Sequence, residues 1–342
     1  MRRKPLIIFD MDGVLVDVTG SYREVTRLTV IFYLSRVLGA RIEDNGFLSL
    51  SDVAAIKKSG GLNNDWVLTD TIINTYLTSA LHGIDGADAA WLWGMKNCAD
   101  DHVLLREVGL IMENVDLSPL EILVKEKNVQ DFYSLSSRGS SSQSPLLLNH
   151  GDVTTGNLSK RIFQEIYLGA DLFEEIYGEK PIFYRADGYI EREHMIPSSA
   201  QLHEIASSYT LSIATGRPEV EARYTLAQFG TGRYFLALVS EDDVFEAERS
   251  SEGSLRKPHP FSLNLCLERS GYTAGDRVYY IGDMPDDMVA AQRAGIVPLG
   301  FVDVNTRESA DEKRGHRVIL EKKGAVAVFG DFQELISFLM NH

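Results

Sequence analysis

Two carboxylates near the start of the chain have the type and spacing that could do chemistry. Asp10 and Asp12 follow the apolar run Leu6–Phe9, which is too short for a helix and predicts a buried strand. Alternation along a strand places both carboxylates on one side, and Gly13 lets the chain turn directly after them. Two like charges side by side are costly unless a cation or a reaction needs them. Taken alone, the motif is also compatible with a solvated turn after an edge strand.

Polar clusters also follow two predicted strands far downstream. Residues 209–214 and 278–281 each predict a buried strand, and small, polar or acidic residues follow each run. In open α/β sheets, sites form at the carboxyl ends of the strands. We therefore expect a hydroxyl, a lysine and several carboxylates to converge there. The segments concerned are Thr215-Gly216-Arg217-Pro218, Arg256-Lys257-Pro258-His259-Pro260 and Gly282-Asp283-Met284-Pro285-Asp286-Asp287.

The order and spacing of these residues resemble the four motifs of the haloacid dehalogenase superfamily of phosphotransferases. Asp10-Met11-Asp12-Gly13-Val14 matches the first motif, and Thr215-Gly216-Arg217 matches the second. Lys257-Pro258 matches the third, and Gly282-Asp283 with Asp287 matches the fourth. The resemblance covers the start and the C-terminal half of the chain. The position of the segment between the first two motifs resembles subfamily I, in which a helical cap is inserted there.

This resemblance implies a Mg²⁺-dependent phosphatase that hydrolyses a small phosphate monoester. Asp10 would attack phosphorus and form an aspartyl-phosphate, which divides one difficult step into two easier ones. Asp12 would protonate the leaving alkoxide and then activate water. The Asp10 carboxylate, the Asp12 backbone carbonyl and Asp283 would bind Mg²⁺, since hard oxygen ligands suit that ion. Asp287 would orient Lys257 or a metal-bound water, so the implied metal set is Asp10, Asp12, Asp283 and Asp287.

The second and third motifs imply groups for the phosphoryl oxygens. Thr215 and the amide of Gly216 would hold these oxygens, and Lys257 would neutralise charge on both the phosphoryl group and Asp10. Arg217 is a further candidate for phosphate binding, with a contact to the inserted segment or a surface ion pair as alternatives. His259 lies beside the lysine, but the motif gives that position no role, and we expect a solvated or packing histidine.

Other activities of the same superfamily remain open at this stage. A sugar-phosphate mutase uses the same residues as a phosphatase. A 2-haloacid dehalogenase requires the Asp10 nucleophile but neither the metal nor a second aspartate, so Asp12 and Asp283 argue against it. A catalytically silent binding protein on this fold is a further alternative. Phosphoglycolate-like and histidinol-phosphate-like substrates are both compatible with the family.

Composition narrows the class of protein. A chain of 342 residues suits two domains. A net charge of −15 argues against a nucleic-acid or anionic-membrane partner. The resemblance implies a small phosphorylated metabolite as the partner, and we expect a monomer or homodimer. Cys98 and Cys266 form no metal-binding pattern and predict buried reduced thiols in a cytoplasmic protein. The basic start at residues 1–4 precedes too short an apolar run for a signal peptide.

Strands alternating with helices predict an α/β fold, a Rossmann-like parallel sheet with an inserted, mainly α-helical cap. We expect the catalytic core in residues 1–16 and 191–342 and the cap in residues 17–190. Besides the strands above, the core pattern predicts a helix after Pro197, a helix after Thr215 that begins at Pro218 and ends before Gly230, a strand over 235–240, a helix over 285–294, and strands over 296–301 and 325–329.

In the insert, apolar spacing predicts helices over 22–38, 69–81 and 99–112. The Ser-rich segment 134–158 predicts a flexible loop that is either a lid or a tolerated surface insertion. The stretch 60–66 resembles a substrate loop of subfamily I caps, which makes Asn63, Asn64 and Trp66 candidates for substrate contact. Trp66, like Trp91 and Trp93, otherwise suits a core position.

Overall fold

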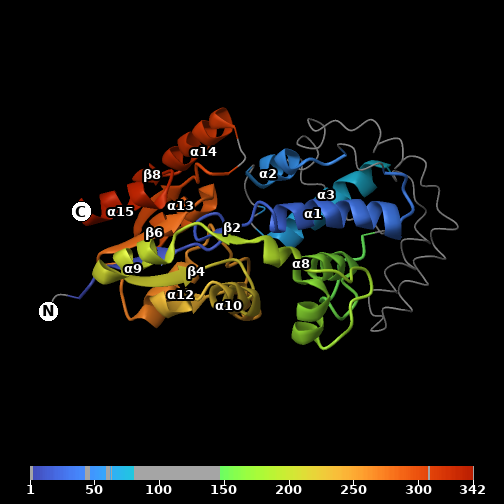
Figure 1. Cartoon of the computed structure of the whole chain (residues 1–342), viewed down its shortest axis with the longest axis horizontal. Helices are drawn as coiled ribbons and strands as arrows, with labels where there is room; N and C mark the ends of the chain where they lie inside the picture. The colour runs from blue at the N-terminus through green and yellow to red at the C-terminus, as the bar shows by residue number, and fades with distance from the viewer. Residues whose placement is uncertain are drawn as a thin grey trace. The chain divides into compact units, whose positions relative to one another are not determined.

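Two compact units make up the chain, the core unit (Met1–Thr19 with Glu193–His342) and the insert unit (Gly20–Arg192). The computed structural model describes residues 3–42, 47–58, 62, 64–80, 147–306 and 309–341, and Figure 1 shows its course. The sequence placed the two boundaries at 16/17 and 190/191, within a few residues of this division. Each unit is described by itself.

A parallel six-stranded sheet forms the centre of the core unit, in the order β5-β4-β1-β6-β7-β8. This order places the first strand of the chain in the middle, between two strands that lie far downstream in sequence. The expected Rossmann-like α/β architecture is therefore confirmed. The strands are β1 Leu6–Phe9, β4 Thr210–Ala214, β5 Phe235–Val239, β6 Val278–Gly282, β7 Val297–Phe301 and β8 Ala327–Phe329.

Helices connect these strands and begin at side chains that cap them. Ser198 and Ser309 each accept a hydrogen bond from the backbone N–H three residues on, which satisfies an orphan donor of the first turn. Pro218 stands at the N-cap position of α10 without a side-chain hydrogen bond, and the helix begins one residue after the predicted start. The helices are α9 Ser199–Ser208, α10 Glu219–Gln228, α11 Glu241–Glu248, α12 Phe261–Ser270, α13 Pro285–Arg293, α14 Ala310–Lys322 and α15 Phe332–Asn341, with a 3₁₀ turn η3 at Gly232–Tyr234.

Alternation along β1 buries both of its faces. Leu6 and Ile8 belong to one apolar cluster with Cys266 of α12 and Ala290 of α13. Phe9 points to the opposite side, where its ring stacks on Phe332 of α15 at 6.2 Å between centroids. Helices therefore cover both sides of the central strand, and the open end of the sheet is left for polar residues.

A short antiparallel ribbon marks where the chain leaves and re-enters the core unit. β2, Val16–Asp17, pairs with β3, His194–Met195. The ribbon follows the first motif directly. The site loop after β1 is thus tied to the returning chain by backbone hydrogen bonds.

The described part of the insert unit is helical. α1, Tyr22–Phe32, continues into the π-helix η1, Tyr33–Val37, where the sequence predicted one helix over 22–38. α3 begins at Asp65 rather than at 69, because Asn64 caps it. The predicted helix over 99–112 lies outside the described residues. The remaining elements are α2 Leu50–Lys58, α3 Asp65–Ala80, α8 Leu158–Tyr177, which the sequence analysis missed, and the 3₁₀ helix η2 Tyr189–Arg192.

The described end of the predicted loop 134–158 is anchored rather than free. Leu147 and Leu148 are buried, and Asn149 forms a bridge with Asn157, the N-cap of α8. Residues 134–146 lie outside the described residues. From Leu147 onward, two buried leucines and a helix cap contact the rest of the unit, and the flexibility of the segment stays a prediction.

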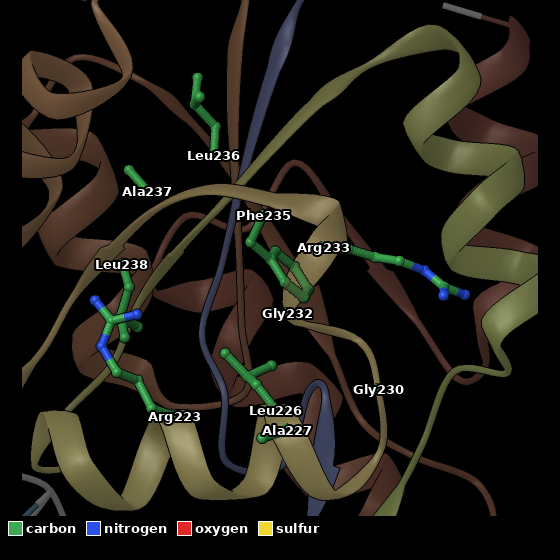
Figure 2. A pocket seen from close by; sticks show the side chains of 10 residues that line it. All are labelled: Arg223, Leu226, Ala227, Gly230, Gly232, Arg233, Phe235, Leu236, Ala237 and Leu238. Carbon is green, nitrogen blue, oxygen red and sulfur yellow. The ribbon is translucent and has the colours of Figure 1, made fainter.

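A groove of about 480 Å³ runs along β5, the edge strand of the sheet. Its lining comes from α10, the turn after it and β5 itself, as Figure 2 shows. Leu236 of β5 is 61% exposed. None of the candidate site residues lines this groove, so it is not the expected active site. No described helix is long and apolar enough to cross a membrane.

Candidate active site

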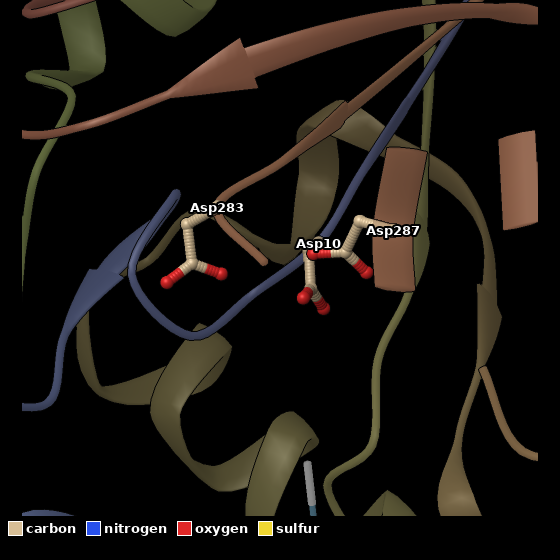
Figure 3. Close-up of side chains that lie close together, drawn as sticks. All are labelled: Asp10, Asp283 and Asp287. Atoms are coloured by element: carbon tan, nitrogen blue, oxygen red, sulfur yellow. The ribbon is translucent and has the colours of Figure 1, made fainter. Parts of the chain in front are cut away.

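Three carboxylates meet at the carboxyl end of the parallel sheet, as Figure 3 shows. Asp10 follows β1, Asp283 follows β6, and Asp287 lies in the first turn of α13. β1 and β6 are neighbours in register, and the Asp10 N–H donates to the carbonyl of Ile281 at 2.8 Å. One oxygen from each carboxylate lies within 4.8 Å of the others. Residues far apart in sequence are therefore brought together by strand pairing.

Two glycines make this close approach possible. Gly13 has φ of 75°, in the left-handed region, and a Cβ there would overlap the carboxylate of Asp283. A Cβ on Gly282 would overlap the side chain of Asp287. Both motif glycines are thus required by the space that the carboxylates occupy, and Gly13 also by its backbone conformation.

Lys257 is the cation at the centre of this cluster. Its Nζ lies 3.2 Å from Oδ1 of Asp10 and 3.0 Å from Oδ1 of Asp287. It also donates to the hydroxyl of Tyr280 at 2.5 Å, and that hydroxyl donates to Asp287 at 3.1 Å. Asp287 additionally accepts from the Met284 N–H at 2.9 Å. Asp287 is therefore placed to orient the lysine, one of the two roles considered from the sequence.

Burial strongly perturbs the ionisable groups of the cluster. Desolvation raises the pKa of Asp10 to about 7, although Lys257 opposes the shift. Desolvation lowers the pKa of Lys257, but the Asp10 and Asp287 carboxylates outweigh it and leave the pKa above its ordinary value. Lys257 is thus a fixed positive charge, whereas Asp10 gives up its proton less readily than an ordinary carboxyl.

The donor set fits a hard divalent cation. Three carboxylates face one ammonium group, which leaves an excess of negative charge within a largely buried cluster. All the converging donors are oxygens, which is the ligand chemistry of Mg²⁺. Asp10 and Asp283 would hold the ion, since Asp287 is occupied by Lys257, Tyr280 and Met284.

Asp12 is not one of the three grouped carboxylates, although its charge acts on Asp10. Its Oδ1 accepts from Nε of Arg217 at 2.5 Å, and its side chain is 24% exposed. The sequence analysis gave Asp12 only a backbone carbonyl at the metal, and that role stays a prediction. The two aspartates of the first motif therefore lie in different environments, one beside a lysine and one beside an arginine.

The second motif lies at the end of β4, the other neighbour of β1. Thr215 is buried, and its Oγ1 accepts from the N–H of Arg217 at 3.1 Å. Gly216 is exposed, and the space where a Cβ would stand is open. An exposed amide beside a buried hydroxyl is compatible with the phosphate-binding role, which stays a prediction.

Arg217 is not a surface residue, which corrects one of the alternatives drawn from the sequence. Its side chain is 0% exposed. The guanidinium donates to both carboxylate oxygens of Glu193, at 2.9 and 3.0 Å, and to Oδ1 of Asp12. A contribution to phosphate binding stays a prediction, but the resolved partners are carboxylates of the protein itself.

Sequence reasoning missed two residues of this region. Tyr280 lies two positions before Gly282 in β6, and a hydroxyl within a buried strand run was the available signal. Glu193 lies in the charged stretch 191–194, and nothing in its neighbours distinguishes it from a surface glutamate. Its side chain is 0% exposed, so only the tertiary structure identifies it.

The residues expected to contact substrate from the insert unit have other partners here. Oδ1 of Asn64 accepts from the N–H groups of Trp66 and Val67, at 3.0 and 3.1 Å, as a helix cap. Nζ of Lys160 lies 3.9 Å from the centre of the Trp66 ring, a cation–π contact. Asn63, Trp91, Trp93 and Cys98 lie outside the described residues, and the substrate role of Asn63, Asn64 and Trp66 stays a prediction.

Two further side chains in the core unit lie outside the carboxylate cluster, the exposed His259 and the buried Cys266. Nδ1 of His259 accepts from the N–H of Phe261 at 3.2 Å, where α12 begins. Cys266 is a buried free thiol, and desolvation raises its pKa to about 12. Such a thiol is inert as a nucleophile. Both results match the expectations drawn from the sequence.

Comparison with known proteins agrees with this geometry. A family model for haloacid dehalogenase-like hydrolases matches residues 4–295, and the chain belongs to this family. It is 29% identical over 132 residues to a phosphoglycolate phosphatase of Pectobacterium atrosepticum, covering 39% of this chain and 50% of that protein. It is 28% identical over 152 residues to a phosphoglycolate phosphatase of Aliivibrio fischeri, covering 43% and 61%.

The chain thus spans about half the length of the curated relatives it matches. A structural genomics target solved by X-ray crystallography superposes with a TM-score of 0.61 at 23% identity, covering 99% of both chains. That likeness shows the fold.

Proposed function

We propose that the protein is a Mg²⁺-dependent phosphatase that hydrolyses a small phosphate monoester through an aspartyl-phosphate on Asp10. The observation that carries the proposal is the Asp10 carboxylate, 3.2 Å from Lys257 and grouped with Asp283 and Asp287. A nucleophile flanked by fixed positive charge is what phosphoryl transfer requires. Membership of the hydrolase family and the names of the curated relatives support the same conclusion.

Two steps follow from the placement of the two aspartates. An oxygen of Asp10 attacks phosphorus, the bond to the ester oxygen breaks, and Asp12 gives that oxygen a proton. Water then attacks the phosphorus of the aspartyl-phosphate, Asp12 takes a proton from the water, and phosphate leaves with the Asp10 carboxylate restored. Lys257 holds charge on Asp10 and the phosphoryl oxygens throughout. Bound Mg²⁺ supplies further positive charge at the phosphoryl group.

Phosphoglycolate is the first substrate to examine, because the curated relatives carry the name phosphoglycolate phosphatase. The insert unit is proposed to act as the cap that selects among esters, since its sequence begins a few residues after the first motif. Replacing Trp66 by Ala is then expected to change the ratio of kcat/KM values between esters. A uniform change across a panel of esters would remove Trp66 from substrate selection.

Release of phosphate tests the proposal. The protein is assayed with 2-phosphoglycolate and with p-nitrophenyl phosphate, in Mg²⁺ and in EDTA. We expect turnover in Mg²⁺ only, and a loss of more than about 100-fold in Asp10→Asn, since an amide is a poor nucleophile. Asp276→Asn is the matched control, because Asp276 lies in the turn before β6, at the opposite end of that strand.

Two outcomes would contradict the proposal. Full activity in EDTA would show that the reaction does not require a metal, and it would favour the dehalogenase alternative. Release of halide from a 2-haloacid would then test that alternative. Equal activity of Asp10→Asn and the control would remove Asp10 as nucleophile. Rapid turnover of a simple ester also argues against a mutase, because a mutase must protect the aspartyl-phosphate from water.

A further inference from the structure

A buried chain of charges leads from the site into the core unit. Arg217 lies between Asp12 and Glu193, and both the arginine and the glutamate side chains are 0% exposed. The terminal nitrogens of Arg217 donate to the two oxygens of Glu193, which leaves Nε for Asp12. Thr225 of α10 completes the set, since its hydroxyl accepts from Arg217 at 3.0 Å and donates to Glu193 at 3.2 Å.

These contacts fix the orientation of the Arg217 guanidinium. A guanidinium is planar, and a bidentate pair with a carboxylate sets the plane as well as the position of its nitrogens. Glu193 therefore determines where Nε points, and Nε determines where Oδ1 of Asp12 lies. The Glu193–Arg217 pair carries no net charge, so Asp12 is held by hydrogen-bond geometry rather than by an unbalanced cation.

The other oxygen of Asp12 stays available. Among the residues that the structure describes, none hydrogen-bonds to its Oδ2, and the side chain is 24% exposed. One oxygen is thus anchored while the second is presented outward. A group that must give up a proton and take one back requires both properties, a fixed position and an unoccupied atom.

We propose that Arg217 and Glu193 are positioning residues that act through Asp12 and not through substrate. Arg217 anchors Oδ1, Glu193 anchors Arg217, and Oδ2 transfers the proton to the ester oxygen in the first step and receives one from water in the second. The inference rests on the proposed phosphatase function and assigns Arg217 a role other than phosphate binding. Glu193 is the first core residue after the insert, and no motif identifies it.

Leaving-group dependence separates this role from a structural one. Nitrophenolate is a stable anion that leaves without a proton, whereas the alkoxide of 2-phosphoglycolate needs one. In Arg217→Lys and Glu193→Gln we expect kcat/KM for 2-phosphoglycolate to fall by about 10- to 1,000-fold, but that for p-nitrophenyl phosphate by less than about 3-fold, since general acid catalysis serves only the former. Lysine retains the charge but not the planar fork.

A double variant and a matched control complete the design. Asp12→Asn should show the same split between esters, and adding Arg217→Lys to it should change kcat/KM by less than about 2-fold, because the arginine acts through Asp12. Arg161→Lys, which alters an equally buried arginine in the insert unit, should leave the ratio of the two esters unchanged. Thermal unfolding of each variant shows which variants are folded. If Arg217→Lys does not fold, Glu193→Gln alone tests the positioning role.

The results distinguish this inference from the proposed function. Wild-type protein that hydrolyses neither ester would overturn both. Wild-type turnover of both esters, with equal losses on the two in Arg217→Lys and Glu193→Gln, would overturn the positioning role alone. An additive loss in the double variant would do the same, because it would show that Arg217 acts independently of Asp12.

Discussion

Arg161 in the insert unit and Arg217 in the core unit are the two arginines that are almost completely buried among the residues that the structure describes, and their roles differ. Arg161 in the insert unit lies between Glu165, 0% exposed, and Glu179, 42% exposed. Arg217 in the core unit lies between Glu193, 0% exposed, and Asp12, 24% exposed. In both cases a buried glutamate compensates the guanidinium, and a second carboxylate reaches toward the surface.

The partners of the two glutamates explain the difference. Glu165 accepts hydrogen bonds from the backbone N–H groups of residues 182–184 as well as from Arg161, so it ties α8 to the segment that follows it. Glu193 has Thr225 and Arg217, and its pair points to a carboxylate of the first motif. A buried ion pair of the same composition therefore organises backbone in one unit and a candidate proton donor in the other.

Removing each arginine should have the largest effect, and an unequal one. Arg217→Met leaves the buried Glu193 without its guanidinium partner, and we expect a loss of about 3–5 kcal/mol in the free energy of unfolding. Arg161→Met should lose less, because three backbone N–H groups still stabilise Glu165. Urea denaturation of both variants measures this, and a larger loss for Arg161→Met would contradict the explanation.

Neutralising each glutamate is the milder test. Glu193→Gln and Glu165→Gln each replace one accepting oxygen by a donating NH₂ group, and we expect each to cost about 1–3 kcal/mol of stability. Only Glu193→Gln should also lower turnover of 2-phosphoglycolate. Stability by urea denaturation and kcat/KM are measured on the same samples. Equal loss of activity in both variants would mean that global destabilisation, and not placement of Asp12, governs the rate.

The contrast also shows what sequence reasoning reaches. Asp10, Lys257 and Asp283 follow or lie between apolar runs at family spacing, and their meeting follows from the rule that parallel strands end at one edge of the sheet. The strands of the core were predicted to within about two residues, because a continuous apolar run is a local signal.

Partners chosen by tertiary packing leave no such signal. Glu193 looks like a surface glutamate in sequence, and only the fold brings Arg217 to it. Arg161 and Glu165 are an i, i+4 pair on α8, but no local signal shows that both are buried. Helix α8 escaped prediction because its polar start follows a Ser-rich stretch, and a kink at Gly169 interrupts its period. Asn64 became a candidate for substrate contact through the resemblance of residues 60–66 to a cap loop, and that role stays a prediction. Its role as a helix cap was not predicted, because it depends on where α3 begins.

Two buried aspartates extend the comparison to pH, with the smallest expected effect. Desolvation raises the pKa of Asp10 in the core unit to about 7. It raises the pKa of Asp70 on α3 to about 6, although hydrogen bonds from Ser159 and Asn149, at 2.6 and 2.7 Å, oppose the shift. Asp10 lies beside other carboxylates that suit a metal, whereas Asp70 has two neutral hydrogen-bond donors and the smaller effect of the Lys160 charge.

A raised pKa means that the folded state binds the proton more tightly than the unfolded state. Each carboxyl therefore favours folding when protonated, and stability falls as pH rises from the ordinary value of 3.8 to about 6 for Asp70 and about 7 for Asp10. Mg²⁺ should reverse this loss for Asp10, because it binds the ionised form, and should leave the share of Asp70 unchanged.

Unfolding free energies between about pH 4 and 8, in EDTA and in Mg²⁺, test both statements. Asp70→Asn should reduce the slope of the unfolding free energy against pH by the same amount in EDTA and in Mg²⁺. Asp10→Asn should flatten it in EDTA and should also abolish the effect of adding Mg²⁺. If Mg²⁺ changed the slope of Asp10→Asn as much as that of the wild type, Asp10 would not be a metal ligand. An unchanged slope in Asp70→Asn would show that this carboxyl titrates at its ordinary pKa, and that burial perturbs the carboxylate of the core unit alone.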